Sequence, residues 1–177
     1  FLYLLIELYR KKNNPIENLG IFTLSIFYII IPFILAIHLN LLSSHQEPLV
    51  IGMFLLIWTN DTFAYLSGRF FGKTKLFERI SPKKTWEGTI GGIIFTIIVG
   101  ISISYWTIEY NMFFWVFAAL LIAPCSIFGD LLESLFKRSL NIKDSGNILP
   151  GHGGILDRFD AAIFAIPFFY TLVIIYS

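Results

Sequence analysis

Long apolar stretches alternate with short polar segments along the chain, and this alternation predicts a series of helices. Five of the stretches are close to the roughly 20 residues that a helix needs to cross a bilayer. They cover residues 21–38, 49–68, 89–108, 112–131 and 161–177. Phe1–Tyr9 resembles the end of one more apolar stretch. The pattern predicts an all-α, polytopic integral membrane protein with five complete transmembrane helices and a partial one at the N-terminus.

The composition strengthens this prediction. The chain has 177 residues, of which 56% are hydrophobic and 14% are charged, and its mean hydropathy is +0.73. Soluble domains carry about 25% charged residues, so the excess apolar surface here requires lipid. The single cysteine, Cys125, excludes an internal disulfide and is expected to be a small buried hydrophobic residue.

Residues 1–177 are predicted to form one membrane-embedded domain, because the sequence shows no internal repeat and no soluble linker. The chain begins inside an apolar stretch without an initiator methionine, so we expect it to be the C-terminal part of a longer protein. No basic stripe with interleaved aromatic residues is visible, and no nucleic-acid partner is expected.

The basic residues predict the orientation in the membrane. All 13 Lys and Arg residues lie in or beside three connections, Arg10–Gly20, Phe71–Gly88 and Leu132–Asp160. The two intervening connections, Asn40–Pro48 and Glu109–Asn111, contain none. The positive-inside rule therefore places the three polar, basic loops in the cytoplasm and the C-terminus outside.

Two polar residues, Asn60 and Asp61, interrupt the apolar stretch 49–68. A carboxylate inside a membrane span costs a few kcal/mol, so it normally faces a partner or a wet cavity. The alternative is that Asp61 lies close enough to the interface to be hydrated. Arg69 and Lys73 follow near the end of the stretch, where two cations could meet an anion.

The next loop contains the segment SPKKTWEG, residues 81–88. Adjacent lysines beside a membrane usually attract anionic headgroups. Here Lys83 and Lys84 lie between the hydroxyls of Ser81 and Thr85, close to the start of the next helix. This grouping favours a polyphosphate ligand, which the hydroxyls and backbone N–H groups would also bind.

Asp130 lies at the end of the apolar stretch 112–131, and Glu133 and Lys137 follow it. These spacings put the three side chains on one face if the helix continues. A surface stripe of salt bridges is the alternative interpretation. It fits poorly, because Asp130 comes at the end of an apolar span and the opposite face consists of Leu and Phe.

The segment PGHGGILDRFD, residues 150–160, precedes the last apolar stretch. Glycines can turn successive N–H groups toward an anion. Two acids follow, Asp157 and Asp160, and both could simply be stabilising residues at a helix N-terminus. That explanation does not account for His152 or for Arg158 between the acids.

Carboxylates, clustered cations and glycine-rich loops on one membrane face are typical of phosphoryl or nucleotidyl transfer. Oxygen ligands bind Mg²⁺, which prefers one or two carboxylates together with substrate phosphates. Catalysis in such sites consists mainly of positioning and of neutralising developing charge. A site at the membrane face suggests that one substrate is a lipid and the other a soluble nucleotide.

Residues 134–160 form a 27-residue stretch that resembles the signature of phosphatidate cytidylyltransferases, also called CDP-diacylglycerol synthases. SPKKTWEG and NDTFAYLSGRFFGK resemble the family's other cytoplasmic segments, so the likeness extends from about Leu49 to the C-terminus. Family members carry further N-terminal spans. The resemblance implies that CTP and phosphatidate are converted to CDP-diacylglycerol and pyrophosphate with Mg²⁺, at the cytoplasmic face of a bacterial inner membrane.

The resemblance also implies roles for individual residues. Asp130 and Asp157 would bind Mg²⁺, with Asp144 as the next candidate, and a second cation such as K⁺ could share these carboxylates. Catalytic roles near the phosphates would fall to Lys137, Arg138, Arg158 and His152. The candidate substrate-binding residues are Asn60, Asp61, Arg69, Lys73, Ser81, Lys83, Lys84, Thr85, Glu133, Lys143, Gly151, Gly153, Gly154 and Asp160.

Other functions stay open at this point. A CTP-dependent polyprenol kinase or another lipid cytidylyltransferase would use similar carboxylates and basic loops. An ion-coupled transporter could use Asp61 and Asp130 as acids within the membrane. The expected partners are CTP, phosphatidate and membrane lipid, and a homodimer is an open arrangement.

Overall fold

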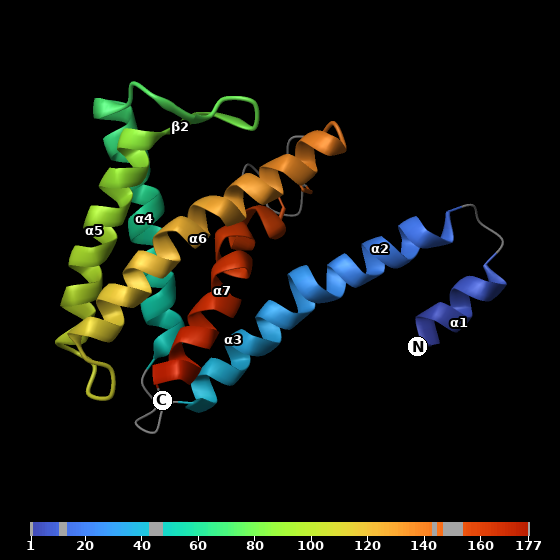
Figure 1. Ribbon diagram of the computed structural model, residues 1–177, viewed down its shortest axis with the longest axis horizontal. Coiled ribbons are helices and arrows are strands. Elements are labelled where there is room, and N and C mark those ends of the chain that lie inside the picture. The colour runs from blue at the N-terminus through green and yellow to red at the C-terminus, as the bar shows by residue number, and fades with distance from the viewer. Residues whose placement is uncertain (1, 11–13, 43–47, 143–144, 147–153, 177) are drawn as a thin grey trace.

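The computed structural model describes residues 2–10, 14–42, 48–142, 145–146 and 154–176 (Figure 1). These residues form helices, one short π-helical segment and one β-hairpin. In chain order the elements are α1 (Leu2–Tyr9), α2 (Pro15–Ser25), the π-helix η1 (Ile26–Ile30), α3 (Ile31–Leu42), α4 (Leu49–Phe71), β1 (Lys75–Phe77), β2 (Ser81–Thr85), α5 (Trp86–Ser104), α6 (Met112–Ser139) and α7 (Leu156–Tyr176).

Within the described ranges, five helical stretches are long and apolar enough to cross a membrane, which confirms the predicted fold class. The first is the continuous run α2–η1–α3, and the others are α4, α5, α6 and α7. Successive stretches run in opposite directions (Figure 1). The end of the bundle that carries β1 and β2 also contains the end of α4, the start of α5, the end of α6 and the start of α7. We call it the hairpin end.

Several predicted boundaries are wrong by a few residues because local sequence extends or shortens the helices. The first spanning helix begins at Pro15, whose fixed φ favours the first helical position. The third spanning helix, α5, ends at Ser104 instead of residue 108, while α6 continues to Ser139, two turns beyond the predicted end. The start of α6 at Met112 is confirmed, and the Asn111 side chain caps it by accepting a hydrogen bond from Phe114 N at 3.1 Å.

The connection between α4 and α5 contains a β-hairpin that the hydrophobic pattern did not predict. Its two short antiparallel strands pair Lys75 with Thr85 and Phe77 with Ser81. The Glu87 carboxylate accepts hydrogen bonds from the backbone N–H of Lys73 at 3.1 Å and from that of the next residue. The hairpin is therefore attached to the first turn of α5.

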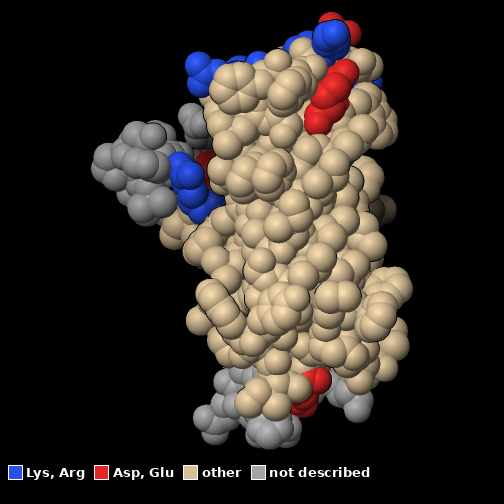
Figure 2. Space-filling model, turned by 90° about the vertical axis from the view of Figure 1, so that its left-hand side faces the viewer, with Lys and Arg blue, Asp and Glu red and all other residues tan. Residues whose placement is uncertain are grey.

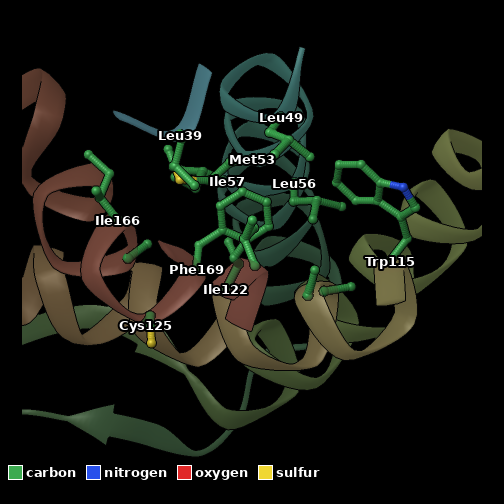
Figure 3. Packing of buried hydrophobic residues seen from close by; sticks show 14 of the residues in the cluster. Leu39, Leu49, Met53, Leu56, Ile57, Trp115, Ile122, Cys125, Ile166 and Phe169 are labelled. Atoms are coloured by element: carbon green, nitrogen blue, oxygen red, sulfur yellow. The ribbon is translucent and has the colours of Figure 1, made fainter. Parts of the chain in front are cut away.

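The hydrophobic core lies between α3, α4, α6 and α7. Figure 3 shows Leu39 from α3 and Met53 from α4 close to Phe169 from α7, with Ile122 of α6 beneath them. All four side chains are fully buried. Cys125 is also buried, as its sequence context predicted.

Helices α4 and α5 are packed closely through glycines. A Cβ atom added to Gly88 would lie 2.6 Å from the carbonyl oxygen of Ala64, and one added to Gly92 would lie 2.7 Å from Oδ1 of Asn60. Larger residues would separate the two helices at these points. The glycines thus bring the polar stretch of α4 beside the start of α5.

Charged side chains on the face shown in Figure 2 lie toward the two ends of the bundle. Figure 2 shows Lys and Arg side chains in the upper part of the visible face, which includes the hairpin end, and a broad belt without charged side chains beneath them. An acidic side chain appears at the opposite end of the belt. An uncharged belt between two polar ends is what a bilayer requires of an integral membrane protein.

Candidate active site

A cavity of about 490 Å³ opens at the hairpin end, between α4, the hairpin, α6 and α7. It brings together residues that lie up to 101 positions apart in the chain, from 60 to 161. The lining residues are Asn60, Asp61, Ala64, Tyr65, Gly68, Arg69, Ser81, Lys83, Lys84, Thr85, Thr89, Ile127, Asp130, Asp157, Asp160 and Ala161.

The inner part of the cavity contains a chain of polar side chains from α4 and α6. Ser126 is completely buried, and its hydroxyl donates a hydrogen bond to Oδ1 of Asp61 at 2.9 Å. The Asn60 amide, which is 1% exposed, donates to the same Ser126 oxygen at 3.3 Å. Asp61 is exposed and lines the cavity. The carboxylate within the span therefore faces a cavity, as its cost in lipid predicted.

Lys84 connects the hairpin to α6. Its ammonium group lies 2.5 Å from Oδ2 of Asp130 and donates to the carbonyl oxygen of Ile127 at 3.4 Å. The Asp61 carboxylate lies within electrostatic range of the same ammonium. The Lys84 ammonium group is thus held by α6 through Asp130 and Ile127, and Asp61 of α4 is near enough to attract it.

Lys137 connects α6 to α7. Its ammonium group donates to Glu133 at 2.9 Å and to Asp157 at 2.7 Å. Glu133 is 1% exposed, and its Oε1 atom has no hydrogen-bond partner among the described residues. The predicted face of Asp130, Glu133 and Lys137 therefore exists, and it is not a surface stripe of salt bridges. Glu133 is buried, Lys137 is partly buried against α7, and Asp130 is partly exposed to the cavity.

Asp157 is the most extensively bonded carboxylate of the cavity. Besides Lys137, it accepts hydrogen bonds from the backbone N–H groups of Ser145 at 2.9 Å and Gly154 at 2.7 Å, and from the Ser145 hydroxyl at 2.8 Å. It therefore fixes both ends of the glycine-rich loop to α6 and α7. Asp160, one turn along α7, also lines the cavity and lies in electrostatic range of Asp130 and Glu133.

Thr85 has a structural task in addition to lining the cavity. Its side-chain oxygen accepts a hydrogen bond from Gly88 N at 3.2 Å and caps the N-terminus of α5. The side chain is packed against Gly68 and Gly72 at the end of α4. This oxygen, predicted to bind a phosphate, also places the hairpin on the helix ends.

Most of the predicted substrate-binding residues meet in the one cavity. The predicted residues that line it are Asn60, Asp61, Arg69, Ser81, Lys83, Lys84, Thr85, Asp130, Asp157 and Asp160. Five predicted residues are not among those that line it: Lys73, Glu133, Lys137, Arg138 and Arg158. Of these, Lys137 bonds to the lining residue Asp157. Gly154 holds Asp157 through its backbone. The remaining predictions, Lys143, Asp144, Gly151, His152 and Gly153, lie outside the described residues.

The sequence analysis did not identify three polar residues of the site. Tyr65 and Thr89 line the cavity, and Ser126 holds Asp61. Tyr65 is one turn after Asp61, a spacing that a helical reading of the span could have used. Ser126 carries no such signal, because it lies in an apolar run of a different helix.

Comparison with known proteins gives the family. Residues 1–176 match the model of the cytidylyltransferase family. The chain belongs to this family. Among its curated relatives, the phosphatidate cytidylyltransferase of Bacillus subtilis (strain 168) is 39% identical over 176 residues, which is 94% of this chain and 62% of the relative. Proteins of the same name from Staphylococcus aureus (strain COL) and Haemophilus influenzae are 48% identical over 123 residues and 39% identical over 169 residues.

The chain spans about half the length of some of these cytidylyltransferase relatives. The Staphylococcus aureus match covers 68% of this chain and 47% of the relative, and the Haemophilus influenzae match covers 89% and 57%. The cavity residues from 60 to 161 lie in the region that the family model matches.

Proposed function

We propose that the protein transfers a cytidylyl group from CTP to phosphatidate, giving CDP-diacylglycerol and pyrophosphate. The observation that carries the proposal is the single cavity in which Asp61, Asp130 and Asp160 meet Lys83 and Lys84 at one end of a membrane-spanning bundle. Family membership supports CTP as the nucleotide. The relatives' name, phosphatidate cytidylyltransferase, supports the lipid substrate.

The residues of this chain would act by binding and by neutralising charge. An oxygen of the phosphatidate phosphate attacks the α-phosphorus of CTP, a new O–P bond forms, and the bond to the β-phosphate oxygen breaks to release pyrophosphate. The attacking group is already an anion, so no nucleophile from the protein is needed. Arg69 and Lys83 line the cavity and would neutralise the triphosphate and the leaving pyrophosphate.

Magnesium binding fits the oxygen ligands of the cavity. The contacts of the Lys84 ammonium group with Asp130 and with the Ile127 carbonyl oxygen support a cation at this position. We propose that Asp130 and Asp157 hold Mg²⁺, with Asp160 as a further carboxylate nearby. A second cation such as K⁺ would share these carboxylates. When bound, Mg²⁺ would neutralise charge on the substrate phosphates. Within the described residues, no group of three or more His, Cys, Asp or Glu is arranged to hold a metal ion.

We further propose that the cavity faces the cytoplasm of a bacterial cell, in the inner membrane. The hairpin end contains the basic connection between α4 and α5 and the end of α6 with Lys137 and Arg138. The positive-inside rule assigns such an end to the cytoplasm. Cytoplasmic CTP would then reach the cavity from water, while phosphatidate would reach it from the membrane.

The deciding experiment uses purified full-length protein with CTP, phosphatidate and Mg²⁺, and follows both CDP-diacylglycerol and pyrophosphate. We expect equal amounts of the two products. A polyprenol in place of phosphatidate tests the lipid kinase, which would form CDP and a phosphorylated alcohol. If neither pair of products appears above the level of an Asp130→Asn variant, the proposed transfer is wrong.

A further inference from the structure

The cavity has a cationic end and an acidic end along α4. The lining residues of this helix run from Asn60 to Arg69, and nine residues of α-helix rise about 13 Å. Arg69 lies at the hairpin end, where Lys83 also lines the cavity. Asp61 lies at the other end of this stripe, inside the membrane span. The Lys84 ammonium also acts on Asp61, but it is bonded to Asp130 and to the Ile127 carbonyl oxygen. The cavity therefore offers a nucleotide cations at Arg69 and Lys83 and a carboxylate acceptor at Asp61.

The acidic end is built to hold one carboxylate in place. The Ser126 hydroxyl, completely buried on α6, donates to Oδ1 of Asp61 at 2.9 Å. Asn60, itself 1% exposed, donates to Ser126 at 3.3 Å and so orients the serine. These hydrogen bonds join α4 to α6, and the Asp61 carboxylate stays exposed to the cavity.

A fixed carboxylate selects ligand groups that donate hydrogen bonds and repels phosphates. A nucleotide that places its phosphates among Arg69 and Lys83 directs its base toward Asp61. Cytosine carries an exocyclic amine that donates to Asp or Glu carboxylates, whereas uracil carries a carbonyl oxygen at the same ring position. A uracil oxygen facing the Asp61 carboxylate would leave two acceptors without a donor, which is unfavourable.

An aromatic residue lies where it could contact the flat face of such a base. Tyr65 is one helical turn from Asp61, on the same side of α4, and it lines the cavity. Its ring is 65% exposed. Bases commonly stack on aromatic side chains while their edges form hydrogen bonds.

We propose that Asp61 determines nucleotide specificity by accepting a hydrogen bond from the 4-amino group of cytosine, and that Ser126 is the positioning residue for Asp61. This inference rests on the proposed function, because it assumes that a cytidine nucleotide enters the cavity. It assigns Asp61 to the nucleotide base, where the sequence indicated only a general substrate-binding role.

The test compares CTP, UTP and dCTP as substrates of the full-length protein, as ratios of kcat/KM. For Asp61→Asn we expect the preference for CTP over UTP to fall about tenfold or more, because the amide can donate to the uracil oxygen. The CTP-to-dCTP ratio should not change. A variant that merely folds poorly loses active molecules and lowers turnover of every nucleotide by the same factor, so the ratios separate specificity from folding.

Ser126→Ala tests the positioning role. The carboxylate keeps its charge but loses its fixed orientation, so we expect a smaller fall of the CTP-to-UTP preference in the same direction. Thr59→Ala is the matched control, since it removes a hydroxyl of α4 that donates within its own helix to Leu55 O at 2.7 Å and does not line the cavity. Its ratios should equal those of the wild type.

Direct binding of CTP and UTP to the purified variants keeps the test decisive if Asp61→Asn turns over too slowly to measure. An unchanged CTP-to-UTP preference in an active or nucleotide-binding Asp61→Asn protein overturns the inference. If Asp61→Asn changes only the CTP-to-dCTP ratio of kcat/KM, Asp61 contacts the ribose instead of the base, and the inference is overturned. Failure of the wild type to use CTP at all would instead contradict the proposed function.

Discussion

The ammonium group of Lys84 lies 2.5 Å from the carboxylate of Asp130 and so joins the β-hairpin to the middle of α6. The two residues are 46 positions apart, and each comes from a segment that the sequence marked separately as functional. Their contact closes the cavity between the hairpin and the helices. The side chains are 26% and 43% exposed, so the pair is accessible to substrate from the cavity.

Lys83, the exposed hairpin lysine that lines the cavity, is expected to bind the phosphates of the nucleotide. Lys83→Ala is expected to raise the KM for CTP about tenfold, because one charge-assisted hydrogen bond to a phosphate is lost, while the KM for phosphatidate changes little. Steady-state kinetics with each substrate varied in turn measures this. Lys75→Ala is the control, since it removes the same charge from β1 outside the cavity. Equal effects of both variants would show that only the overall charge matters.

The ion pairs of Lys137 should stabilise the bundle. Lys137→Met leaves the carboxylates of Glu133 and Asp157 without their common cation, although the two side chains are only 2% and 12% exposed. Breaking a buried pair costs about 3–5 kcal/mol, so the midpoint of thermal unfolding in detergent should fall clearly. Arg138→Met, the same change at the next, exposed position, should leave the midpoint near that of the wild type. A similar shift in both variants would exclude a specific role of the pairs.

The carboxylates proposed to hold Mg²⁺ should make activity depend on the metal. A chelator should abolish CDP-diacylglycerol formation, and added Mg²⁺ should restore it. Asp130→Asn should lower turnover at least about a hundredfold and raise the Mg²⁺ concentration needed for half-maximal activity. Asp157→Asn should also abolish formation, with membrane insertion intact. Near-normal turnover of either variant would remove that residue from the metal site.

The close contact of α4 and α5 should not tolerate a side chain at Gly88. In Gly88→Ala the new Cβ would lie 2.6 Å from the Ala64 carbonyl oxygen, so the helices must separate. We expect a loss of about 1–3 kcal/mol of stability, typical of overpacking, measured by thermal unfolding. Gly20→Ala is the control, because no atom lies within 4 Å of the added carbon. Equal stability of the two variants would contradict the packing.

The membrane character and most of the site chemistry could be predicted from the sequence, because both depend on residue type and order. Apolar stretches must be buried in lipid wherever they occur, and this gave five spans with errors of only a few residues at most ends. The largest errors were at the end of α6 and the start of α2, followed by the start of α7, and at all three the helix continues through polar sequence. At α6 and α7, contacts such as Lys137 with Asp157 stabilise helical turns that hydrophobicity does not predict.

The sequence by itself determined that Asp61, Asp130 and Asp157 are exceptional, since a carboxylate at or near lipid depth is costly without a partner. Only the tertiary structure decided which partners they have. Ser126 holds Asp61, Lys84 holds Asp130, and Lys137 with the loop N–H groups holds Asp157. These pairings depend on how helices distant in the chain pack, on glycines that allow close approach, and on a hairpin without a hydrophobic pattern.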